Sequence, residues 1–303
     1  MEKLIISDQS IDLNQLIDAV VNAADIELSD APSFVKKIDK GADFLKNKLA
    51  EDGVIYGVTT GYGDSCDTGV NRQLAMQLPH NLYTFHGCGT GRNLSAEQTK
   101  LVLIIRLISL AKGVSGVRLK LLKQILLLLK KDILPMIPEE GSVGASGDLT
   151  PLSYLAAVLC GEREVMYRGD LCSASEALQA ENIEPLRLMP KEGLAIMNGT
   201  AVMSALAVEA YRRAAYLSKL CSRLTALTAI GLGSDKQHFD GFLFSVKPHR
   251  GQALVAQRIR EDLDSCTQLY ASGRLQERYS VRCAPHVIGV LEDTLPWSNT
   301  TLE

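Results

Sequence analysis

The first residues that could do chemistry lie in a loop of small residues, GSVGASGDLTPLSYLAA, at positions 141–157. Glycine recurs at every third position, at 141, 144 and 147, and glycine tolerates backbone geometries that other residues avoid. This spacing indicates a tight turn or the close approach of another group. A serine stands at the centre of the loop, in the tripeptide Ala145, Ser146 and Gly147.

Common motifs explain this loop only in part. A nucleophile elbow has the pattern G-x-S-x-G, but Asp148 stands where its final glycine would be. A phosphate-binding loop needs G-x-x-x-x-G-K-S/T, and the glycines here follow G-x-x-G-x-x-G instead. An ordinary helix entry explains Asp148 or Ser146 as the cap of a helix that starts near Pro151. None of these accounts explains why the tripeptide has no bulky side chain.

Two further stretches place aromatic side chains beside glycine loops. YGVTTGYGDS begins at Tyr56 and contains Tyr62, so a flexible loop presents two phenols. NLYTFHGCGTG contains Phe85 and His86, and it lacks the spacing of a dinucleotide-binding loop. Taken singly, a glycine loop with tyrosines is more often an ordinary turn than a functional site, and a lone histidine is more often structural than catalytic.

Two more stretches place polar side chains in apolar or helical settings. MNGTAVMS puts Asn198 in an apolar helix, where a buried amide must find a partner. QERYSVRCAPHVIG spaces Gln276, Tyr279 and Arg282 three residues apart, which indicates one face of a helix or a tight turn. Taken singly, Arg282 is equally consistent with an ordinary surface charge.

The composition describes a globular protein with no sign of nucleic-acid or metal binding. The chain has 303 residues, 46% of them hydrophobic, and a net charge of −3 with no basic stripe. Its seven cysteines are scattered without a C-x-x-C pair, which favours reduced thiols. The amino terminus lacks a signal-peptide pattern, and the most apolar run, LVLIIRLISLA, is broken by Arg106 and too short to span a bilayer. We therefore expect a soluble, cytoplasmic protein without membrane, nucleic-acid or metal partners.

Helical periodicity dominates the chain and predicts a mainly α fold with small β elements near the amino-terminal half. Apolar residues recur at helical spacing over three segments, 97–113, 117–133 and 194–232. Strand-like segments are few and lie at 4–7, 54–60 and 164–169. The last residues, LEDTLPWSNTTLE, follow what looks like a helix start and predict either a ragged tail or a fragment of a longer protein.

Together, five motifs resemble those of the histidine, phenylalanine and tyrosine ammonia-lyases. They are YGVTTGYGDS, NLYTFH, GSVGASGDLTPL, MNGTA and QERYSVRCAPHVIG, in that order, and G-x-x-ASGDL-x-PL is the most specific. The resemblance runs from about residue 10 to the end of the chain. It implies a histidine ammonia-lyase-like fold, with an amino-terminal domain at 1–193 and the start of a central helical bundle at 194–303. Family members are much longer, so the rest of that bundle is expected to be missing.

The resemblance also implies a prosthetic group and accounts for the tripeptide. In the family, an Ala-Ser-Gly tripeptide cyclises on its own backbone, loses two waters and gives a methylidene-imidazolone electrophile. A backbone nitrogen must attack a carbonyl two residues away, a compression that small residues permit. Ala145, Ser146 and Gly147 meet this demand, so we expect them to form the group autocatalytically, with no external cofactor.

Roles for other residues follow from the same resemblance. Tyr56 matches the tyrosine that removes the β-proton of the substrate. Arg282 matches the residue that clamps the substrate carboxylate. Asn198 matches the amide that helps to hold the prosthetic ring and the carboxylate. Tyr279, grouped with the catalytic residues, and Gln276 match residues that line the same cavity.

One pair departs from the family's pattern and bears on the substrate. At the two positions that contact the substrate ring, phenylalanine-type enzymes of the family carry Phe-Leu, tyrosine-type enzymes His-Leu and histidine-type enzymes Ser-His. This chain has Phe85 and His86 at these positions. His86 could hydrogen-bond a phenol or an imidazole while Phe85 supplies an apolar wall. Tyr62, where many relatives carry phenylalanine, is a further substrate-binding candidate. The expected substrate is a small aromatic amino acid, with tyrosine or histidine favoured and phenylalanine possible.

Several alternatives stay open. An aminomutase of the same family uses the same electrophile and returns ammonia to the β-carbon. A truncated, inactive homologue could act as a structural or binding subunit and would keep an unmodified tripeptide. A hydrolase with Ser146 as nucleophile fits the motif least well. Asp148 either supports ring formation or caps the following helix. Because the family builds its active site from several subunits of a tetramer, a homo-oligomer is expected.

Overall fold

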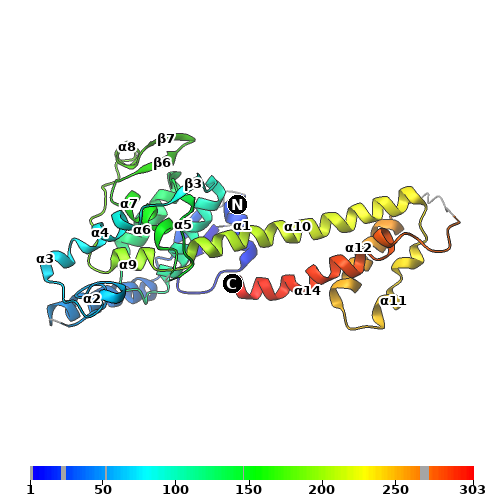
Figure 1. The fold of residues 1–303 in the computed structure, drawn as a ribbon, viewed down its shortest axis with the longest axis horizontal. Coiled ribbons are helices and arrows are strands. Elements are labelled where there is room, and N and C mark those ends of the chain that lie inside the picture. Colours follow the sequence, from blue (N-terminus) through cyan, green and yellow to red (C-terminus); the bar gives the residue numbers. More distant parts are fainter. Residues whose placement is uncertain (1–2, 22–24, 52, 146, 267–272) are drawn as a thin grey trace. The chain divides into compact units, whose positions relative to one another are not determined.

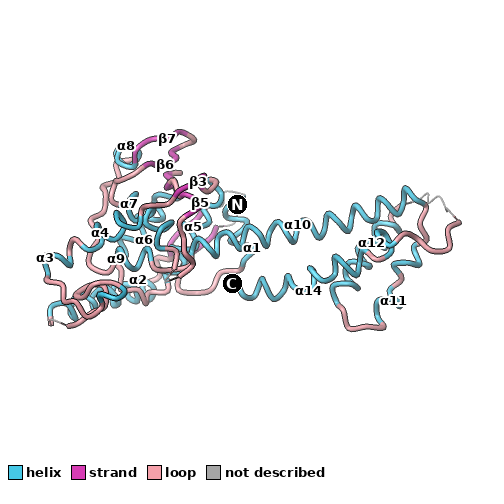
Figure 2. The backbone as a smooth tube through the Cα atoms, viewed as in Figure 1, coloured by secondary structure: helices cyan, strands magenta, loops and turns pink. Residues whose placement is uncertain are grey.

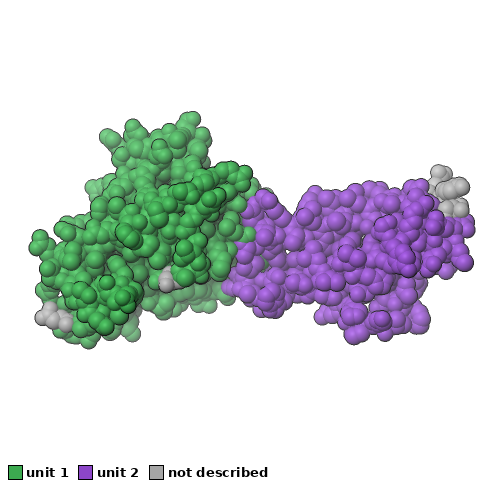
Figure 3. Space-filling model, viewed as in Figure 1, with its two compact units in different colours: residues 1–206 green, residues 207–303 purple. Residues whose placement is uncertain are grey.

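The computed structural model describes residues 3–21, 25–51, 53–145, 147–266 and 273–303. The chain divides into two compact units, Met1–Leu206 and Ala207–Glu303, which Figure 3 colours separately. Helices dominate each unit, as predicted (Figures 1 and 2). This division concerns compactness, and the domain boundary expected after residue 193 stays a prediction.

The first unit combines short and medium helices with small sheets. Its helices are α1 (Leu13–Val21), α2 (Pro32–Ala50), α3 (Arg72–Ala75), α4 (Leu78–His86), α5 (Ala96–Ala111), α6 (Leu119–Lys130), α7 (Leu149–Leu159), α8 (Ala174–Ala180) and α9 (Glu192–Met197), with a 3-10 turn, η1 (Gly63–Ser65). Its strands are β1 (Lys3–Ile6), β2 (Asp25–Leu28), β3 (Thr90–Asn93), β4 (Ile133–Pro135), β5 (Pro138–Glu140), β6 (Glu164–Tyr167) and β7 (Asp170–Ser173). The pair β1–β2 is parallel, whereas β3–β5 and β4–β6–β7 are antiparallel. The strands predicted at 4–7 and 164–169 are therefore confirmed as β1 and β6.

Helices α5 and α6 form much of the core of this unit because most of their surface is apolar. Leu103 of α5 and Leu121 of α6 are fully buried. A capping box starts α5: the hydroxyl of Ser95 accepts the backbone N–H of Gln98, whose side chain accepts the backbone N–H of Ser95. Both helices predicted here are confirmed, each slightly shorter than expected.

The strand predicted at 54–60 is wrong, because this segment forms turns with one isolated β-bridge at Thr60. Its β-branched residues favour a strand. The hydroxyls of Thr59 and Thr60 instead accept the backbone N–H groups of Ile55 (2.8 Å) and Gly57 (3.0 Å). Threonine side chains that bond the local backbone compete with strand pairing.

The long helix predicted at 194–232 is interrupted. Helix α9 ends, residues 198–200 break the helical path, and α10 (Ala201–Leu232) begins. Gly199 favours the break because glycine is a poor helix former. The side chain of Asp148, remote in sequence, supplies the cap at which α10 starts.

By length and composition alone, Glu192–Leu232 is the one helical stretch of the described residues that is apolar enough to cross a membrane. Half of its most apolar window is buried inside the protein. The break at 198–200 also divides this stretch.

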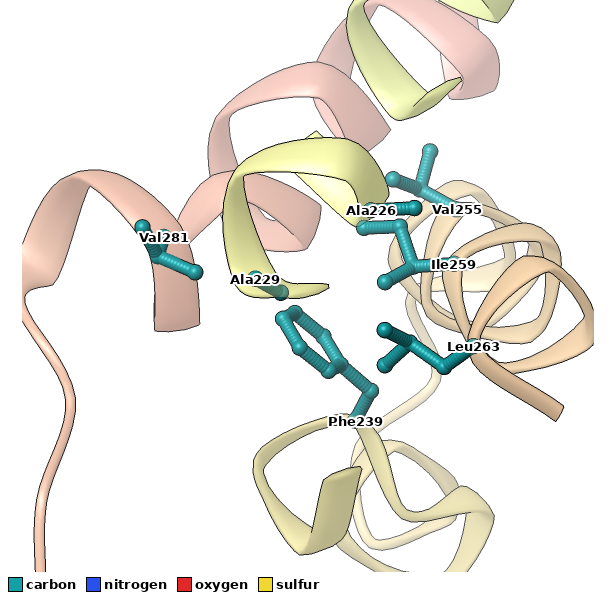
Figure 4. Close-up of a cluster of buried hydrophobic side chains, with 7 residues drawn as sticks. All are labelled: Ala226, Ala229, Phe239, Val255, Ile259, Leu263 and Val281. Atoms are coloured by element: carbon teal, nitrogen blue, oxygen red, sulfur yellow. The ribbon is translucent and has the colours of Figure 1, made fainter. Parts of the chain in front are cut away.

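The second unit is built on the greater part of α10 and on the helices that follow it. They are η2 (Lys236–Phe239), α11 (Gly241–Ser245), α12 (Arg250–Asp264), α13 (Tyr279–Arg282) and α14 (Ala284–Leu302). Apolar side chains from several of these helices meet around a fully buried phenylalanine (Figure 4). The cluster consists of Ala226, Ala229, Phe239, Val255, Ile259, Leu263 and Val281.

A buried carboxylate also ties the helices of this unit together. Glu292 of α14 accepts hydrogen bonds from the hydroxyl of Ser218 on α10 (2.5 Å) and from Arg258 on α12 (2.5 Å). Because α14 continues to Leu302, the last residues are helical, and the prediction of a ragged tail is wrong.

Candidate active site

The tripeptide lies in the loop between β5 and α7, where glycine is required by backbone geometry. Gly141, Gly144 and Gly147 have φ values of 141°, 64° and 88°, a region that favours glycine. A Cβ at Gly147 would overlap the backbone of Gly199, whereas a Cβ at Gly144 would meet nothing within 4 Å. Ala145 is exposed. Ser146 lies outside the described residues. The loop is thus compressed at Gly147 and open at Gly144.

Asp148 links this loop to the break between α9 and α10. Its backbone N–H donates to the carbonyl of Gly199 (2.6 Å), and its side chain is only 6% exposed. The carboxylate accepts the N–H groups of Val202 (2.9 Å) and Met203 (3.1 Å), at the start of α10. Asp148 also precedes the first residue of α7, but its side chain makes no capping bond there. Asp148 as the side-chain cap of the following helix is therefore wrong, and its carboxylate binds the start of α10 instead. The alternative cap, Ser146, lies outside the described residues.

Arg106 is a functional candidate that the sequence did not single out. It lies on α5, only 4% exposed, and its Nη2 donates to the carbonyls of Ala195 and of Asn198 (3.4 Å). Burial lowers the pKa of Arg106 to about 10, and the nearby carboxylate of Asp148 partly opposes that shift. The signal was present: one arginine inside an apolar helix must find buried partners.

Helix α9, which leads to Asn198, is held at its other end by an ion pair between a buried glutamate and a partly exposed arginine. Glu192 is 1% exposed and accepts hydrogen bonds from Arg118 at Nη2 (2.7 Å) and Nε (2.9 Å). It also accepts the backbone N–H of Met189 (2.8 Å). The bond to Glu192 raises the pKa of Arg118. Asn198 follows the last residue of α9 with its side chain exposed, so the amide is free of the buried partner that an apolar helix would demand.

Tyr56 and Tyr62 lie on one loop in different environments. The phenolic oxygen of Tyr56, which is 52% exposed, accepts the backbone N–H of Gly63 (2.9 Å). Burial, with a smaller effect of Tyr56, raises the pKa of Tyr62 to about 12. Gly57, with φ of 65°, lies between the ring of Tyr62 and Leu194 of α9, where a Cβ would clash with both. The tyrosine loop therefore packs directly against α9.

Phe85 and His86 form the last turn of α4. Their rings pack edge to face with centroids 5.3 Å apart, and Phe85 is 81% exposed. Nδ1 of His86 lies 2.9 Å from the carbonyl of Leu82, which can only accept, so Nδ1 carries the proton. Neutral His86 then offers Nε2 as a hydrogen-bond acceptor beside an exposed aromatic ring.

Tyr279, Arg282 and Gln276 belong to the second unit. The guanidinium of Arg282 lies 4.1 Å from the centroid of the Tyr279 ring, and its Nε donates to the carbonyl of Glu277 (3.0 Å). Within the described residues, the two Nη atoms of Arg282 have no hydrogen-bond partner. Gln276 precedes α13 and is exposed, so Tyr279 and Arg282 share the helix and Gln276 does not.

The structure therefore forms separate groups from the predicted residues. In the first unit the tripeptide loop meets Asn198 and Gly199, Tyr56 accompanies Tyr62, and Phe85 accompanies His86. The second unit holds Tyr279 beside Arg282. No cluster of metal-ligating side chains occurs in the part of the chain that the structure describes.

Comparison with known proteins defines the class to which this mainly α fold and its loops belong. The family model described as aromatic amino acid lyase matches residues 11–303. Histidine ammonia-lyase from Alkaliphilus oremlandii is 36% identical over 300 residues, covering 98% of this chain and 59% of the relative. The enzyme of the same name from Bacillus cytotoxicus is 40% identical over 275 residues, covering 90% and 54%.

Solved structures agree. A phenylalanine aminomutase from Pantoea agglomerans superposes with a TM-score of 0.90 at 28% identity, covering all of this chain and 61% of its own. Histidine ammonia-lyase from Trypanosoma cruzi gives 0.87 at 30% identity, covering 99% and 56%. The chain belongs to the aromatic amino acid lyase family, and its fold is that of the histidine and phenylalanine ammonia-lyases. It spans somewhat more than half the length of these bacterial relatives.

Proposed function

We propose that this chain carries part of a carbon–nitrogen lyase that converts an aromatic L-amino acid into ammonia and the α,β-unsaturated acid. Histidine is the favoured substrate because the curated relatives above are histidine ammonia-lyases, and tyrosine is the second choice. The observation that carries the proposal is the compression of Gly147 against Gly199, together with the hydrogen bond from the Asp148 N–H.

The residues present fit a methylidene-imidazolone group formed from Ala145, Ser146 and Gly147. Cyclisation needs a backbone nitrogen pressed towards a carbonyl two residues away, and the close contact at Gly147 supplies pressure from one side. The space around Gly144 and the exposure of Ala145 leave room for an approaching amine. Such a group supplies an electrophilic carbon to which the substrate's amine adds.

The remaining steps fall to side chains of the chain itself. Tyr56 acts as the base: its phenolate oxygen, which the N–H of Gly63 stabilises before the transfer, takes the β-proton and becomes neutral. The bond between the α-carbon and nitrogen then breaks as the α,β double bond forms. Arg282, braced by Tyr279 and by the carbonyl of Glu277, binds the substrate carboxylate through its Nη atoms. The resemblance assigns exposed Asn198 to the prosthetic ring or the substrate carboxylate, and Gln276 to the lining of the substrate cavity.

The substrate ring is read by Phe85 and His86, with Tyr62 nearby on its own loop. A neutral His86 with Nε2 as acceptor can take the N–H of an imidazole or the O–H of a phenol. Phe85 provides apolar contact for either ring. A phenyl ring has no donor for Nε2 of His86, so phenylalanine is the least favoured of the three proposed substrates.

An aminomutase is the second candidate, and the superposition on a phenylalanine aminomutase favours it specifically. The two activities share their proton removal and differ in whether ammonia leaves or returns to the β-carbon. Chromatography of the products for a β-amino acid separates them. As further parts of the proposal, the working protein is cytoplasmic and a homo-oligomer, a tetramer as the family resemblance implies.

The mass of the proteolytic peptide that spans residues 141–157 tests the proposal. A deficit of two waters, absent from Ser146→Ala, is expected, with ammonia release from histidine or tyrosine. An unmodified parent peptide would contradict the proposal and favour a structural or binding subunit. Modification without ammonia or β-amino acid would contradict the assigned substrates. Labelling of Ser146 by a serine-directed phosphonate would favour a hydrolase instead.

A further inference from the structure

Arg106 is buried in α5, and none of the steps above uses it. Its side chain is 4% exposed, and its Nε has no hydrogen-bond partner within the described residues. A buried charge with an unsatisfied donor costs free energy, so a compensating interaction must hold it there. That interaction is with the end of α9 and the residue that follows it.

The guanidinium of Arg106 binds the carboxyl end of α9, a helix too short to be stable without outside contacts. Helix α9 has six residues, and the last carbonyls of any helix lack partners within it. Arg106 donates to the carbonyls of Ala195 and Asn198 at that end. A cation also suits the negative pole of the helix. With Glu192 bound to Arg118 at the amino end, α9 is fixed at both ends.

The same guanidinium fills the space beside Gly199. A Cβ at Gly199 would overlap Nη1 of Arg106, and Gly199 does not have positive φ, so it is this close contact, and not the backbone conformation, that disfavours a side chain there. Gly199 also receives the N–H of Asp148 on its carbonyl (2.6 Å) and lies against Gly147. The Asn198–Gly199 segment is therefore held between Arg106 and the tripeptide loop.

We propose that Arg106 is a positioning residue for ring formation: it holds the Asn198–Gly199 segment against Gly147 and so compresses the tripeptide. This inference rests on the proposed function. In the reaction, the nitrogen of Gly147 bonds to the carbonyl carbon of Ala145. The oxygen of that carbonyl leaves as one water with the amide hydrogens of Gly147 and Ser146, and a double bond forms between the carbonyl carbon and the nitrogen of Ser146. The hydroxyl of Ser146 leaves with its α-hydrogen as the second water. Among the described residues, Arg106 donates no hydrogen bond to Ala145 or Gly147, and it acts through Gly199.

Two variants with different chemistry test this role. Arg106→Met removes the guanidinium, and Gly199→Ala displaces it without removing it. A cavity of about 570 Å³, lined by Arg106, Ser109, Asn198 and Ser204 among others, adjoins the site and gives the displaced side chain room, so both variants are expected to fold. Gly231→Ala on α10 is the matched control, because a Cβ there meets nothing within 4 Å.

Two readouts are taken on each purified 303-residue variant, with circular dichroism to verify folding. The first is the fraction of the 141–157 peptide that has lost two waters at a fixed time after synthesis. The second is hydrogen exchange at the amides of Asp148, Val202 and Met203, whose acceptors belong to this network. In Arg106→Met and Gly199→Ala we expect at least a tenfold fall in the fraction of peptide that has lost two waters. We also expect a tenfold rise in the rate of amide exchange. Arg106→Lys, which reaches one carbonyl, should recover part of each, and Gly231→Ala should match the parent.

The outcomes separate this inference from the proposed function. A parent that has lost two waters, with Arg106→Met modified to the same extent, overturns the positioning role and leaves the proposed function standing. A parent with an intact tripeptide overturns the proposed function. In that case hydrogen exchange still tests whether Arg106 holds the Asn198–Gly199 segment in place. Unchanged protection in folded Arg106→Met overturns that role, and lost protection supports it.

Discussion

At the scale of single residues, the two phenols of the tyrosine loop lie in different surroundings. Tyr62 is kept neutral by burial, which raises its pKa to about 12. Tyr56 is half exposed and receives an amide N–H on its oxygen. Titratable groups whose environments differ in this way often divide binding and proton transfer between them. The exposure of Tyr56 supports its proposed role as the base, and Tyr62 beside it stays neutral.

Tyr56→Phe is expected to lower the rate of ammonia release by about 100-fold or more, because general-base groups contribute on that order. Only one hydrogen bond is lost from a half-exposed side chain, so the fold and the two-water deficit at 141–157 should be unchanged. Steady-state assays and peptide mass measure the two effects. Tyr216→Phe, at a side chain 64% exposed on α10, is the control. A Tyr56→Phe enzyme with the parental rate would remove Tyr56 from the mechanism.

The raised pKa of Tyr62 predicts how the free energy of unfolding changes at alkaline pH. Its folded pKa of about 12 exceeds the ordinary value of 10.0, so between these limits the folded chain binds a proton that the unfolded chain has lost. The free energy of unfolding therefore falls as pH rises from 10 towards 12. Tyr62→Phe removes this contribution, so its stability relative to the parent should improve between pH 9 and pH 11 in urea unfolding. An equal difference at both pH values would contradict the assignment.

At the scale of elements, the start of α10 depends on a residue from another loop. Helix amino termini leave N–H groups without partners, and α10 receives its acceptor from Asp148 rather than from its own preceding residues. The same carboxylate faces Arg106. One side chain thus joins the tripeptide loop, α10 and α5.

Asp148→Ala is expected to destabilise the chain by about 1–2 kcal/mol, the range for losing a helix cap. Asp148→Asn keeps an acceptor oxygen and should cost less. Urea unfolding measures both, with Asp18→Ala on the exposed face of α1 as a control expected within about 0.5 kcal/mol of the parent. A stability for Asp148→Ala equal to that of the parent would show that the cap contributes nothing.

The sequence predicted the elements whose pattern is local and missed those that depend on distant contacts. Helices α5 and α6 follow from their own apolar spacing and from the glycines between them. The break at Gly199 depends on Asp148 and Arg106, which lie far away in the chain and become visible only in the fold. The pattern at 54–60 predicts a strand because hydropathy carries no information on where the threonine hydroxyls form hydrogen bonds. The tripeptide was found because its small residues are themselves the signal.

At the scale of the whole molecule, the helices of the second unit leave apolar stripes uncovered. On α10 the exposed side chains are Leu217, Leu224 and Leu227, and on α14 they are Val287, Val290 and Trp297. Their spacings of three and seven residues place each set on one helical face. Contiguous apolar surface of this kind marks protein–protein contact in soluble proteins. The stripes therefore support the proposed homo-oligomer independently of any relative.

Self-association through these stripes should be measurable, and placing one charged side chain in a stripe should weaken it. Sedimentation equilibrium of the parent is expected to show an oligomer, and Leu224→Glu and Val290→Lys should each weaken it. Burying one such side chain is worth about 1.5–3 kcal/mol, and about 1.4 kcal/mol is a tenfold change in dissociation constant. Each variant should therefore raise that constant at least tenfold while its melting temperature stays near the parent's, because the replaced side chains lie outside the buried core. Leu171→Lys, 56% exposed on β7 of the first unit, should leave association unchanged. A monomeric parent, or equal effects from all three substitutions, would mean that the stripes are not the interface.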